Sequence, residues 1–447
     1  MEVSSRRMKR VDIAEVRLWD RLIGAVAWDS QRRLASYEHA EDFLESGIEP
    51  APLMMPLSRA LYVFPELNPT TFQGLPGMLS DSLPDKFGNL LIDQWLAGQG
   101  RAAGDFSPVE RLCYMGERGM GALEFHPLMK GKPRRSEPLE VQNLVRLANE
   151  ALAGKGQLRT VLDHDGDASE NAEALRDIIQ VGTSAGGARA KAVIAWHPET
   201  GEIRSGQVGD SEGFEPWLIK FDGVTGNRDK ERADPLGYGE VEYAYHLMAR
   251  EAGIEMSDCR LLRENGRAHF MTRRFDRTND GKKIHLQSLC AMGHFDFNLA
   301  GATSYEQCFQ TMRRIGLSRT EVEEQFRRTV FNLVTRNQDD HTKNIAFLMD
   351  RGGTWRLSPA YDVTFAYNPV GEWTGSHQMS VNGKRDGFII DDLLAFAAYG
   401  SVRTRQAKSI IREVEETAKD FTAFADEAGI EEEKAAKIQS GFRWFTG

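Results

Sequence analysis

The sequence predicts an α+β protein with a small mixed α/β subdomain at the N-terminus, then a β-rich lobe and a mainly helical C-terminal lobe. Short apolar runs typical of strands lie between about 190 and 221. A helical period begins at Glu240, and the pattern is mainly helical after about 300. At 447 residues the chain exceeds what one hydrophobic core usually serves. We therefore expect three units, at 1–135, 136–239 and 240–447.

Composition favours an ordinary soluble protein. Hydrophobic residues make up 41% and charged residues 27% of the chain, and the formal net charge of −10 argues against a protein that coats nucleic acid. The four cysteines are far apart and form no CxxC pair, which indicates buried thiols in a reducing compartment. The N-terminus lacks an apolar secretory segment, and no apolar run is long enough to span a membrane. A cytoplasmic location is expected.

In the N-terminal unit, the segment 17–28 predicts two short strands around a turn at Gly24. Residues 80–89 lead into a helix over 90–98, whose apolar residues recur at helical spacing. Gly98 and Gly100 should end that helix. The polar stretch KGKPRRSEP at 130–138 is the best candidate for a linker.

The middle unit is expected to be rich in strands. The apolar runs 192–196 and 216–221 suit strands, and residues 197–202 between them carry turn signals. The period then changes to that of a helix, with Gly253 as its C-terminal cap. The predicted buried face of this helix comprises Val241, Ala244, Tyr245 and Met248.

The clearest helix of the C-terminal unit begins near Thr320 and leads the chain into a polar loop at Asn337. Its predicted inward residues are Val322, Phe326, Val330 and Leu333. A smaller β-rich lobe followed by a larger helical lobe is the order found in protein kinases.

The most informative segment is that loop, NQDDHTKN at 337–344, followed by Asp362. Asp339 and Asn344 have the D-x-x-x-x-N spacing of the kinase catalytic loop, and Asp362 comes after a strand–turn–strand segment at 345–357. Kinases use this order for an aspartate that orients the substrate hydroxyl, then an amide and a second aspartate that hold magnesium. The H-R-D and D-F-G letters are missing, so this would be a distant kinase.

Two details of this loop stay open. Asp340 is adjacent to Asp339 and equally acidic, so either carboxylate is a candidate for the base. His341 is interpreted as a structural side chain rather than a general base, because Asp339 already fills that role. A polar loop that caps a helix is the alternative for the whole segment.

Upstream, the segment 182–191 is rich in glycine and ends in Lys191, just before a predicted strand. Glycines let backbone amides approach phosphate oxygens, although a flexible turn is an equal alternative. Lys220 lies in an otherwise apolar strand and needs an anionic partner if it is buried. Glu242 is the favoured partner and Glu240 the near alternative; a lysine at a solvent-exposed edge remains the default.

These segments together resemble the HipA family, the serine/threonine-kinase-like toxins of bacterial toxin–antitoxin modules. The resemblance spans nearly the whole chain in the family's order, and D-x-H-x-K-N (339–344) and P-x-Y-D (359–362) are its most specific elements. Further matching segments are LSDSLPDKFGNLLIDQWL (79–96), MGERGMGALEF (115–125), TSAGGARAKA (183–192), WLIKF (217–221), EVEYAYHLMAREAGI (240–254), RRFDR (273–277) and HQMSVNGK (377–384).

The resemblance implies a protein-kinase-like two-lobed fold with an extra N-terminal subdomain, and ATP and Mg²⁺ as cofactors. Asp339 would be the catalytic aspartate, while Asn344 and Asp362 would hold the metal. Ser184 would be a self-phosphorylated serine, whose added charge would repel ATP phosphates. The nucleotide site would comprise Ser184, Ala185, Gly186, Gly187, Ala188, Arg189, Lys191, Lys220, Glu242, His341 and Lys343.

The family also implies a helix-turn-helix antitoxin of HipB type as partner, DNA contact mainly through that antitoxin, and a protein substrate such as an aminoacyl-tRNA synthetase. No membrane partner is expected. An arginine-rich stretch could add contacts to DNA phosphates, but a structural role is at least as well supported; it comprises Arg263, Arg267, Arg273, Arg274 and Arg277. Two other functions stay open: a small-molecule kinase, and a non-catalytic, nucleotide-gated subunit of a repressor complex.

Overall fold

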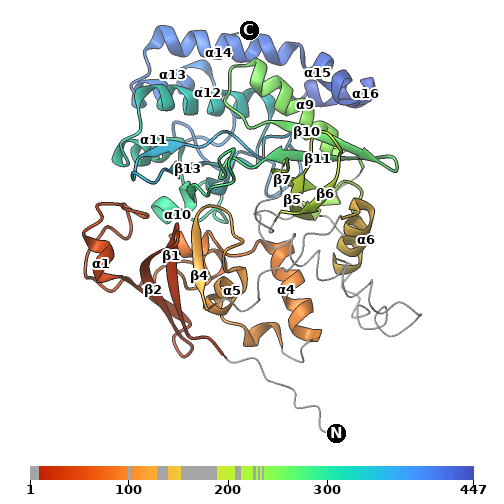
Figure 1. The fold of residues 1–447 in the computed structure, drawn as a ribbon. Coiled ribbons are helices and arrows are strands. Elements are labelled where there is room, and N and C mark those ends of the chain that lie inside the picture. The colour runs from red at the N-terminus through yellow and green to blue at the C-terminus, as the bar shows by residue number, and fades with distance from the viewer. Residues whose placement is uncertain are drawn as a thin grey trace, which may run out of the picture.

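The computed structural model describes residues 10–446 except for 99–101, 128–138, 153–188, 207–212, 225–227, 230–231 and 234–235. The predicted linker at 130–138 and the glycine-rich loop up to residue 188 lie outside the described residues. Three groups of elements meet in the molecule (Figure 1): an N-terminal sheet with small helices, a five-stranded sheet, and a stack of C-terminal helices.

The N-terminal unit is built on a four-stranded antiparallel sheet with the order β3-β2-β1-β4. Its strands are β1 (Ile13–Leu18), β2 (Arg21–Asp29), β3 (Leu34–His39) and β4 (Leu123–His126). The prediction of two strands in this region is confirmed, but the predicted turn at Gly24 is wrong. The chain turns at Trp19 and Asp20, which have φ angles of 52° and 67°. Gly24 lies within β2, where a Cβ would come within 2.5 Å of the Tyr37 Oη.

Short helices connect this sheet to the rest of the protein. They are α1 (Glu41–Leu44), α2 (Pro69–Phe72), α3 (Gly77–Ser80), α4 (Lys86–Gly98), the 3-10 turn η1 (Ala103–Asp105) and α5 (Pro108–Met115). α4 confirms the predicted helix that ends at Gly98, although it begins at Lys86. α5 begins with a capping box, in which Ser107 and Glu110 bond each other's backbone amides.

The second sheet has five strands in the order β10-β11-β7-β5-β6. They are β5 (Lys191–Trp196), β6 (Ile203–Ser205), β7 (Glu215–Lys220), β10 (Cys259–Glu264) and β11 (Arg267–Arg273), and a separate pair comprises β8 (Arg228–Asp229) and β9 (Arg232–Ala233). β5 and β7 confirm the two predicted strands. Ala192, Ile194 and Ile219 share a buried apolar cluster with residues of α4 and of α6 (Val141–Leu152).

Helix α9 (Tyr238–Glu251) packs beside β10 and β11. The predicted face of this helix is buried, at Val241, Ala244, Tyr245 and Met248. Gly253 follows the helix with a φ of 78°, a left-handed conformation in which glycine is not strained, so the predicted cap is confirmed.

The C-terminal unit is mainly helical, as predicted. Its helices are α10 (Leu289–Gly293), α11 (Tyr305–Arg314), α12 (Arg319–Thr335), α13 (Ile390–Tyr399), α14 (Thr404–Lys419), α15 (Phe421–Ala428) and α16 (Glu432–Gln439). A three-stranded sheet joins β12 (His285–Ser288), β13 (Ala346–Met349) and β14 (Trp355–Leu357), and the 3-10 turn η2 (Thr342–Asn344) precedes β13. The predicted inward residues of α12 are all buried: Val322, Phe326, Val330 and Leu333.

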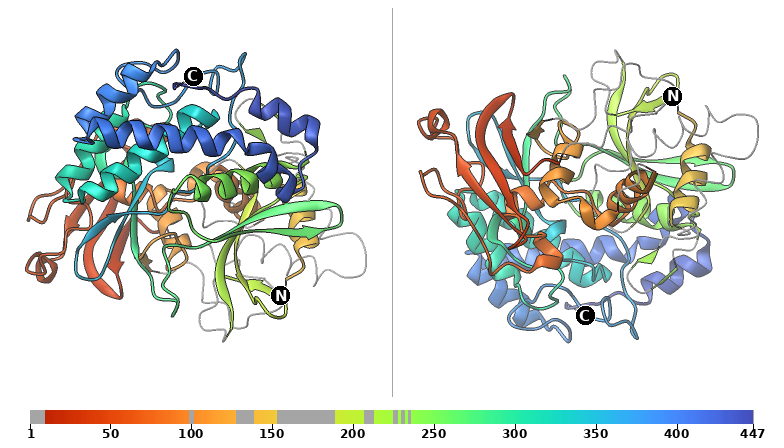
Figure 2. Two further views of the ribbon diagram at one scale, coloured as in Figure 1. Left: turned by 90° about the horizontal axis from the view of Figure 1, so that it is seen from above. Right: turned by 90° about the horizontal axis from the view of Figure 1, so that it is seen from below.

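One large hydrophobic cluster runs from the N-terminal sheet through α9 to the C-terminal helices, so the N-terminal unit shares a core with the helical lobe. Seen from below, α4 and α5 lie between the N-terminal strands and the five-stranded sheet (Figure 2). Among the described residues, no helix is both long and apolar enough to cross a lipid bilayer. The four cysteines are buried and unpaired, as the sequence predicts.

Candidate active site

Lys220, the last residue of β7, is buried and forms an ion pair with Glu242 of α9. The Lys220 Nζ lies 2.5 Å from a Glu242 carboxylate oxygen. Glu240, the alternative partner, instead pairs with Arg263 at 2.9 Å. α9 comes this close to the sheet because Gly239 has no Cβ: a side chain there would overlap the carbonyl oxygen of Ala268 on β11.

The same ammonium also binds Asp362, which follows β14 and has a φ of 57°. A left-handed conformation is uncommon outside glycine, and it turns the Asp362 carboxylate toward β7. Burial alone would raise the pKa of Asp362, but the charges of Lys220 and Lys191 outweigh it and hold this pKa well below its usual range. The pKa of Lys220 is raised, because Asp362 and Glu242 together outweigh the opposing effect of burial. The lysine is therefore charged and Asp362 is ionised at neutral pH.

A second buried lysine stands directly opposite Lys220. In the antiparallel pairing of β5 with β7, Lys191 is the register partner of Lys220, so both side chains lie on one face of the sheet. The Lys191 Nζ lies 3.7 Å from Asp85, at the start of α4. Burial lowers the pKa of Lys191, and the nearby carboxylates of Asp85 and Asp362 oppose that shift.

The loop that carries Asp339 and Asp340 begins where α12 ends. Arg336 adopts the left-handed conformation at the end of the helix and turns the chain into the loop. The Asp340 carboxylate is buried and accepts hydrogen bonds from Tyr305 Oη, His377 Nδ1 and the backbone N–H of Gln378. All of its bonds hold the loop in place.

Asp339 lies beside it and is more accessible, with 27% of its side chain exposed. Its Oδ1 accepts a hydrogen bond of 2.6 Å from the Trp373 indole and lies 3.9 Å from His341 Nε2. The geometry thus separates the two adjacent acids: Asp340 is a buried internal acceptor, and Asp339 is the more exposed carboxylate.

Asn344 closes the loop by donating from Nδ2 to the Asp339 backbone oxygen, at 2.8 Å. Its Oδ1 accepts no hydrogen bond from the described part of the chain, so it can serve as a ligand. Together, Asn344 and the ionised Asp362 offer the oxygen donors that magnesium prefers. The residues present therefore fit a Mg²⁺ ion.

Lys343 and Arg189 lie at the margins of this group. The Lys343 Nζ is 3.9 Å from Asp81 and 5.1 Å from the centre of the Phe297 ring. The Arg189 guanidinium stacks at 3.6 Å over the ring of Tyr238, the first residue of α9. The other predicted loop residues, Ser184, Ala185, Gly186, Gly187 and Ala188, lie outside the described residues.

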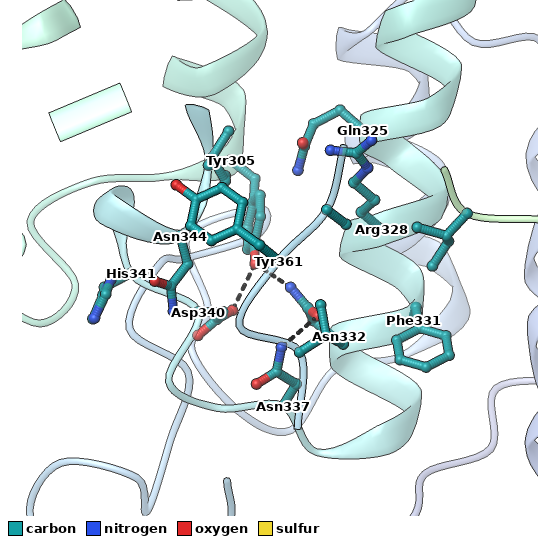
Figure 3. Close-up of a pocket in the computed structure, with 14 residues that line it drawn as sticks. Tyr305, Gln325, Arg328, Phe331, Asn332, Asn337, Asp340, His341, Asn344 and Tyr361 are labelled. Atoms are coloured by element: carbon teal, nitrogen blue, oxygen red, sulfur yellow. Dashed lines mark hydrogen bonds between the residues drawn. The ribbon is translucent and has the colours of Figure 1, made fainter. Parts of the chain in front are cut away.

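A small cavity of about 30 Å³ lies between the loop at residues 337–344 and α12 (Figure 3). Its lining includes the polar side chains of Gln325, Asn332, Asn337 and His341. This space suits one or two water molecules rather than a nucleotide. Asn337 of the loop donates to the Asn332 side chain of α12 at 2.9 Å, which attaches the start of the loop to the helix.

The arginine-rich stretch has structural partners. Arg274 and Arg277 each lie 2.7 Å from the buried carboxylate of Asp276, which also accepts the backbone N–H of Gly121. Arg273 lies 3.4 Å from Glu215. These contacts favour the structural interpretation over phosphate contacts with DNA.

Sequence reasoning missed three residues of this region: Asp81, Asp85 and Trp373. Both aspartates lie in the segment 79–96, which resembles the HipA family, but their contacts with Lys343 and Lys191 join elements more than a hundred residues apart. The only sequence feature that could have pointed to these two aspartates is their position in the polar segment SDSLPD, just before a helix.

Comparison with known proteins identifies the two parts of the chain. Residues 14–126 match the family model of the HipA N-terminal domain, and residues 183–422 match that of the HipA-like C-terminal domain. Two proteins of Sinorhizobium fredii (strain NBRC 101917 / NGR234), named as presumed kinases, are also similar. Y4mE is 30% identical over 142 residues and Y4dM 28% identical over 201 residues. These matches cover 29% and 42% of this chain, and only 34% and 48% of the relatives' own lengths.

A solved structure matches over almost the whole chain. It is the HipA of Shewanella oneidensis MR-1, from a toxin–antitoxin system in complex with HipB and its operator DNA. The TM-score is 0.66 at 16% identity, and the match covers 96% of this chain and 95% of that one. This likeness concerns the fold, and the prediction of a kinase-like, two-lobed architecture is confirmed. The C-terminal family model covers more than half of this chain, and the chain therefore belongs to the HipA family.

Proposed function

We propose that this protein is an ATP- and Mg²⁺-dependent serine/threonine-protein kinase of HipA type and the toxin of a toxin–antitoxin pair. One observation carries the proposal: the buried Lys220 is bound by both Glu242 and Asp362. A lysine–glutamate pair beside a metal-binding aspartate is the arrangement with which kinases hold nucleotide phosphates.

The residues have distinct tasks in this scheme. Lys220 and Lys191 place two positive charges on one face of the sheet, where they can neutralise nucleotide phosphates. ATP, when bound, supplies the γ-phosphoryl group that is transferred. Asn344 and Asp362 would hold Mg²⁺.

Asp339 orients the substrate hydroxyl and accepts its proton as the phosphoryl group is transferred. The Trp373 indole and the closure of the loop by Asn344 keep its carboxylate in position. Asp340 is excluded from this role because its oxygens already bind three donors.

The partners follow from the family. We propose a HipB-type antitoxin, with DNA bound mainly through that antitoxin, because the arginine-rich stretch is occupied by carboxylates of the same chain. A translation component such as an aminoacyl-tRNA synthetase is the proposed protein substrate. Regulation by phosphorylation of Ser184 completes the proposal.

Transfer of labelled phosphate from ATP, with Asp339→Asn and Asp362→Asn as variants, tests the activity. Each variant should lose several powers of ten in rate, because one removes the base and the other a metal ligand. Label in proteins of a lysate supports the protein kinase, whereas label only in metabolites would indicate a small-molecule kinase. ATP binding without any transfer by the wild type would indicate a non-catalytic, nucleotide-gated subunit.

The binding site is tested separately by calorimetry. Lys220→Ala should weaken ATP binding and slow turnover, because it removes a positive charge from a partly desolvated site. Unchanged ATP affinity and turnover in this variant would contradict the assignment of Lys220.

A further inference from the structure

Among the described residues, a short segment of the N-terminal subdomain contacts the lysines of the proposed nucleotide site and its neighbouring loop. This strap, residues 81–85, runs between α3 and α4 and carries an aspartate at each end. Asp81 faces the helical lobe and Asp85 faces the five-stranded sheet. The strap therefore contacts both lobes.

The Asp81 end is attached to elements that flank the catalytic loop. Its carboxylate accepts hydrogen bonds from the Ser288 backbone N–H at 2.7 Å and from the Ser288 hydroxyl at 2.8 Å. Ser288 caps α10, which packs against the η2 turn. The other partner of Asp81 is Lys343 of η2, at 3.9 Å. The strap is thus held to the catalytic loop both directly and through α10.

The Asp85 end is attached to the sheet. One carboxylate oxygen accepts the Gly88 backbone N–H at 2.6 Å and caps α4. The other oxygen accepts no hydrogen bond in the described part of the chain and lies 3.7 Å from the Lys191 ammonium. Both side chains are only 3% exposed. Burial raises the pKa of Asp85 to about 7, and the nearby charge of Lys191 opposes that shift. The Asp85 carboxyl group and the Lys191 amine thus face each other inside the protein.

Neighbouring residues hold this end rigidly. The Asn89 side chain donates to the Pro84 carbonyl oxygen at 2.8 Å and accepts from Arg111 of α5, also at 2.8 Å. Asp85 is thereby fixed to the helices of the N-terminal subdomain rather than to the lobe whose lysine it faces.

Lys191 needs such a partner because of its surroundings. Its register partner is Lys220, a like charge on the same face of the sheet. The acidic groups that also act on Lys191, Asp362 and Glu242, are already bound to Lys220. Asp85 is therefore the acid in this group that lies beside Lys191 and is not shared with Lys220.

We propose that Asp85 is a positioning residue, which holds the Lys191 ammonium at the phosphate end of the nucleotide site. The N-terminal subdomain would thus complete the kinase site rather than merely accompany it. This inference rests on the proposed kinase function.

Asp85→Asn is a clean test of the proposal. An asparagine side-chain oxygen can still cap α4, so the variant removes the ionisable carboxyl group that faces Lys191 and keeps the cap. We expect Mg·ATP to bind about tenfold to hundredfold more weakly, which corresponds to the loss of one charge-assisted interaction. Adenosine, which has no phosphates, should bind as to the wild type. Thermal melting of the variant checks that the fold is kept.

Three further variants make the comparison specific. Lys191→Met should weaken ATP binding similarly, and Asp85→Asn added to it should cost nothing more, because Asp85 acts through that lysine. Asp93→Asn is the matched control. It removes a carboxylate of α4 that lies 2.7 Å from Arg111, a residue of the same subdomain. This control should bind ATP normally.

Several outcomes would overturn the inference. Equal ATP affinity in wild type and Asp85→Asn would show that Lys191 needs no positioning. Equal weakening for ATP and adenosine, or additive losses in the double variant, would show that Asp85 supports the fold in general. Failure of the wild type itself to bind Mg·ATP would instead refute the proposed function on which the inference rests.

Discussion

Replacing Asp340 with asparagine should destabilise the protein far more than the same change at Asp339. In Asp340, one carboxylate oxygen lies 2.8 Å from both Tyr305 Oη and His377 Nδ1, and the other accepts the Gln378 N–H at 2.7 Å. Asparagine has a single acceptor oxygen, so at least one of these donors would face its NH₂ group.

The size of the effect follows from burial. The residue is 3% exposed, so water cannot replace the lost acceptor. A bond to a charged acceptor contributes about 1.5–3 kcal/mol, and a donor left unsatisfied costs about 1–3 kcal/mol. We expect Asp340→Asn to lower the free energy of unfolding by about 2–4 kcal/mol. Asp339→Asn can keep the Trp373 bond and should cost less than about 1 kcal/mol.

Chemical denaturation of the two variants, together with their rates of phosphate transfer, makes the comparison. Asp339→Asn should be stable and inactive. If Asp340→Asn has wild-type stability and no activity while Asp339→Asn remains active, then the base is Asp340 and the assignment is off by one position.

Other predictions address the elements around the site. Gly239→Ala should lower stability by about 1–3 kcal/mol and weaken ATP binding, because the new Cβ would push α9, with Glu242, away from Ala268; melting curves and calorimetry would show both effects, and an unchanged melting temperature would refute the packing argument. Burial lowers the pKa of His285 from 6.5 to about 4, so its contribution to stability is complete above pH 6.5 and is lost as the pH falls toward 4. At about 1.4 kcal/mol per pH unit, protonation of His285 should lower the free energy of unfolding by about 2 kcal/mol between pH 6.5 and 5. Chemical denaturation of His285→Gln should show a smaller decrease in stability over the same pH range. Finally, Ser184 should carry a phosphate in active protein but not in inactive Asp339→Asn protein; peptide mapping that finds the phosphate in the inactive protein expressed alone would mean that another enzyme adds it.

The helices and the interior strands were predictable because their apolar residues repeat with the period of the element. In α12, Val322, Phe326, Val330 and Leu333 define one face, and that face is buried. The turn at Trp19–Asp20 was not predictable in this way. Neither residue is a glycine, so the sequence pattern placed the turn at Gly24, the nearest glycine. Gly24 is instead required by close packing against Tyr37 across the sheet.

The residues of the candidate site also fall into two groups, those that a sequence pattern predicts and those that only tertiary packing brings together. Spacing within one loop pointed to Asp339 and Asn344, and the resemblance to a family supplied Glu242 as the partner of Lys220. The contacts of Asp85 and Asp81 depend on tertiary packing between distant segments, and no local pattern encodes them. Asp339 and Asp340 are equivalent as letters, and only their different burial and bonding separate them.

The burial of the thiols has a practical consequence for following motion in this protein. Burial raises the pKa of each cysteine to about 12, so Cys113, Cys259, Cys290 and Cys308 should resist alkylation while the chain is folded. A cysteine introduced on the surface of each lobe could therefore be labelled with a dye without removing the native ones. Such a dye pair would report directly on whether the lobes approach each other when nucleotide is added. Labelling of the native cysteines would indicate that the protein has opened locally or unfolded.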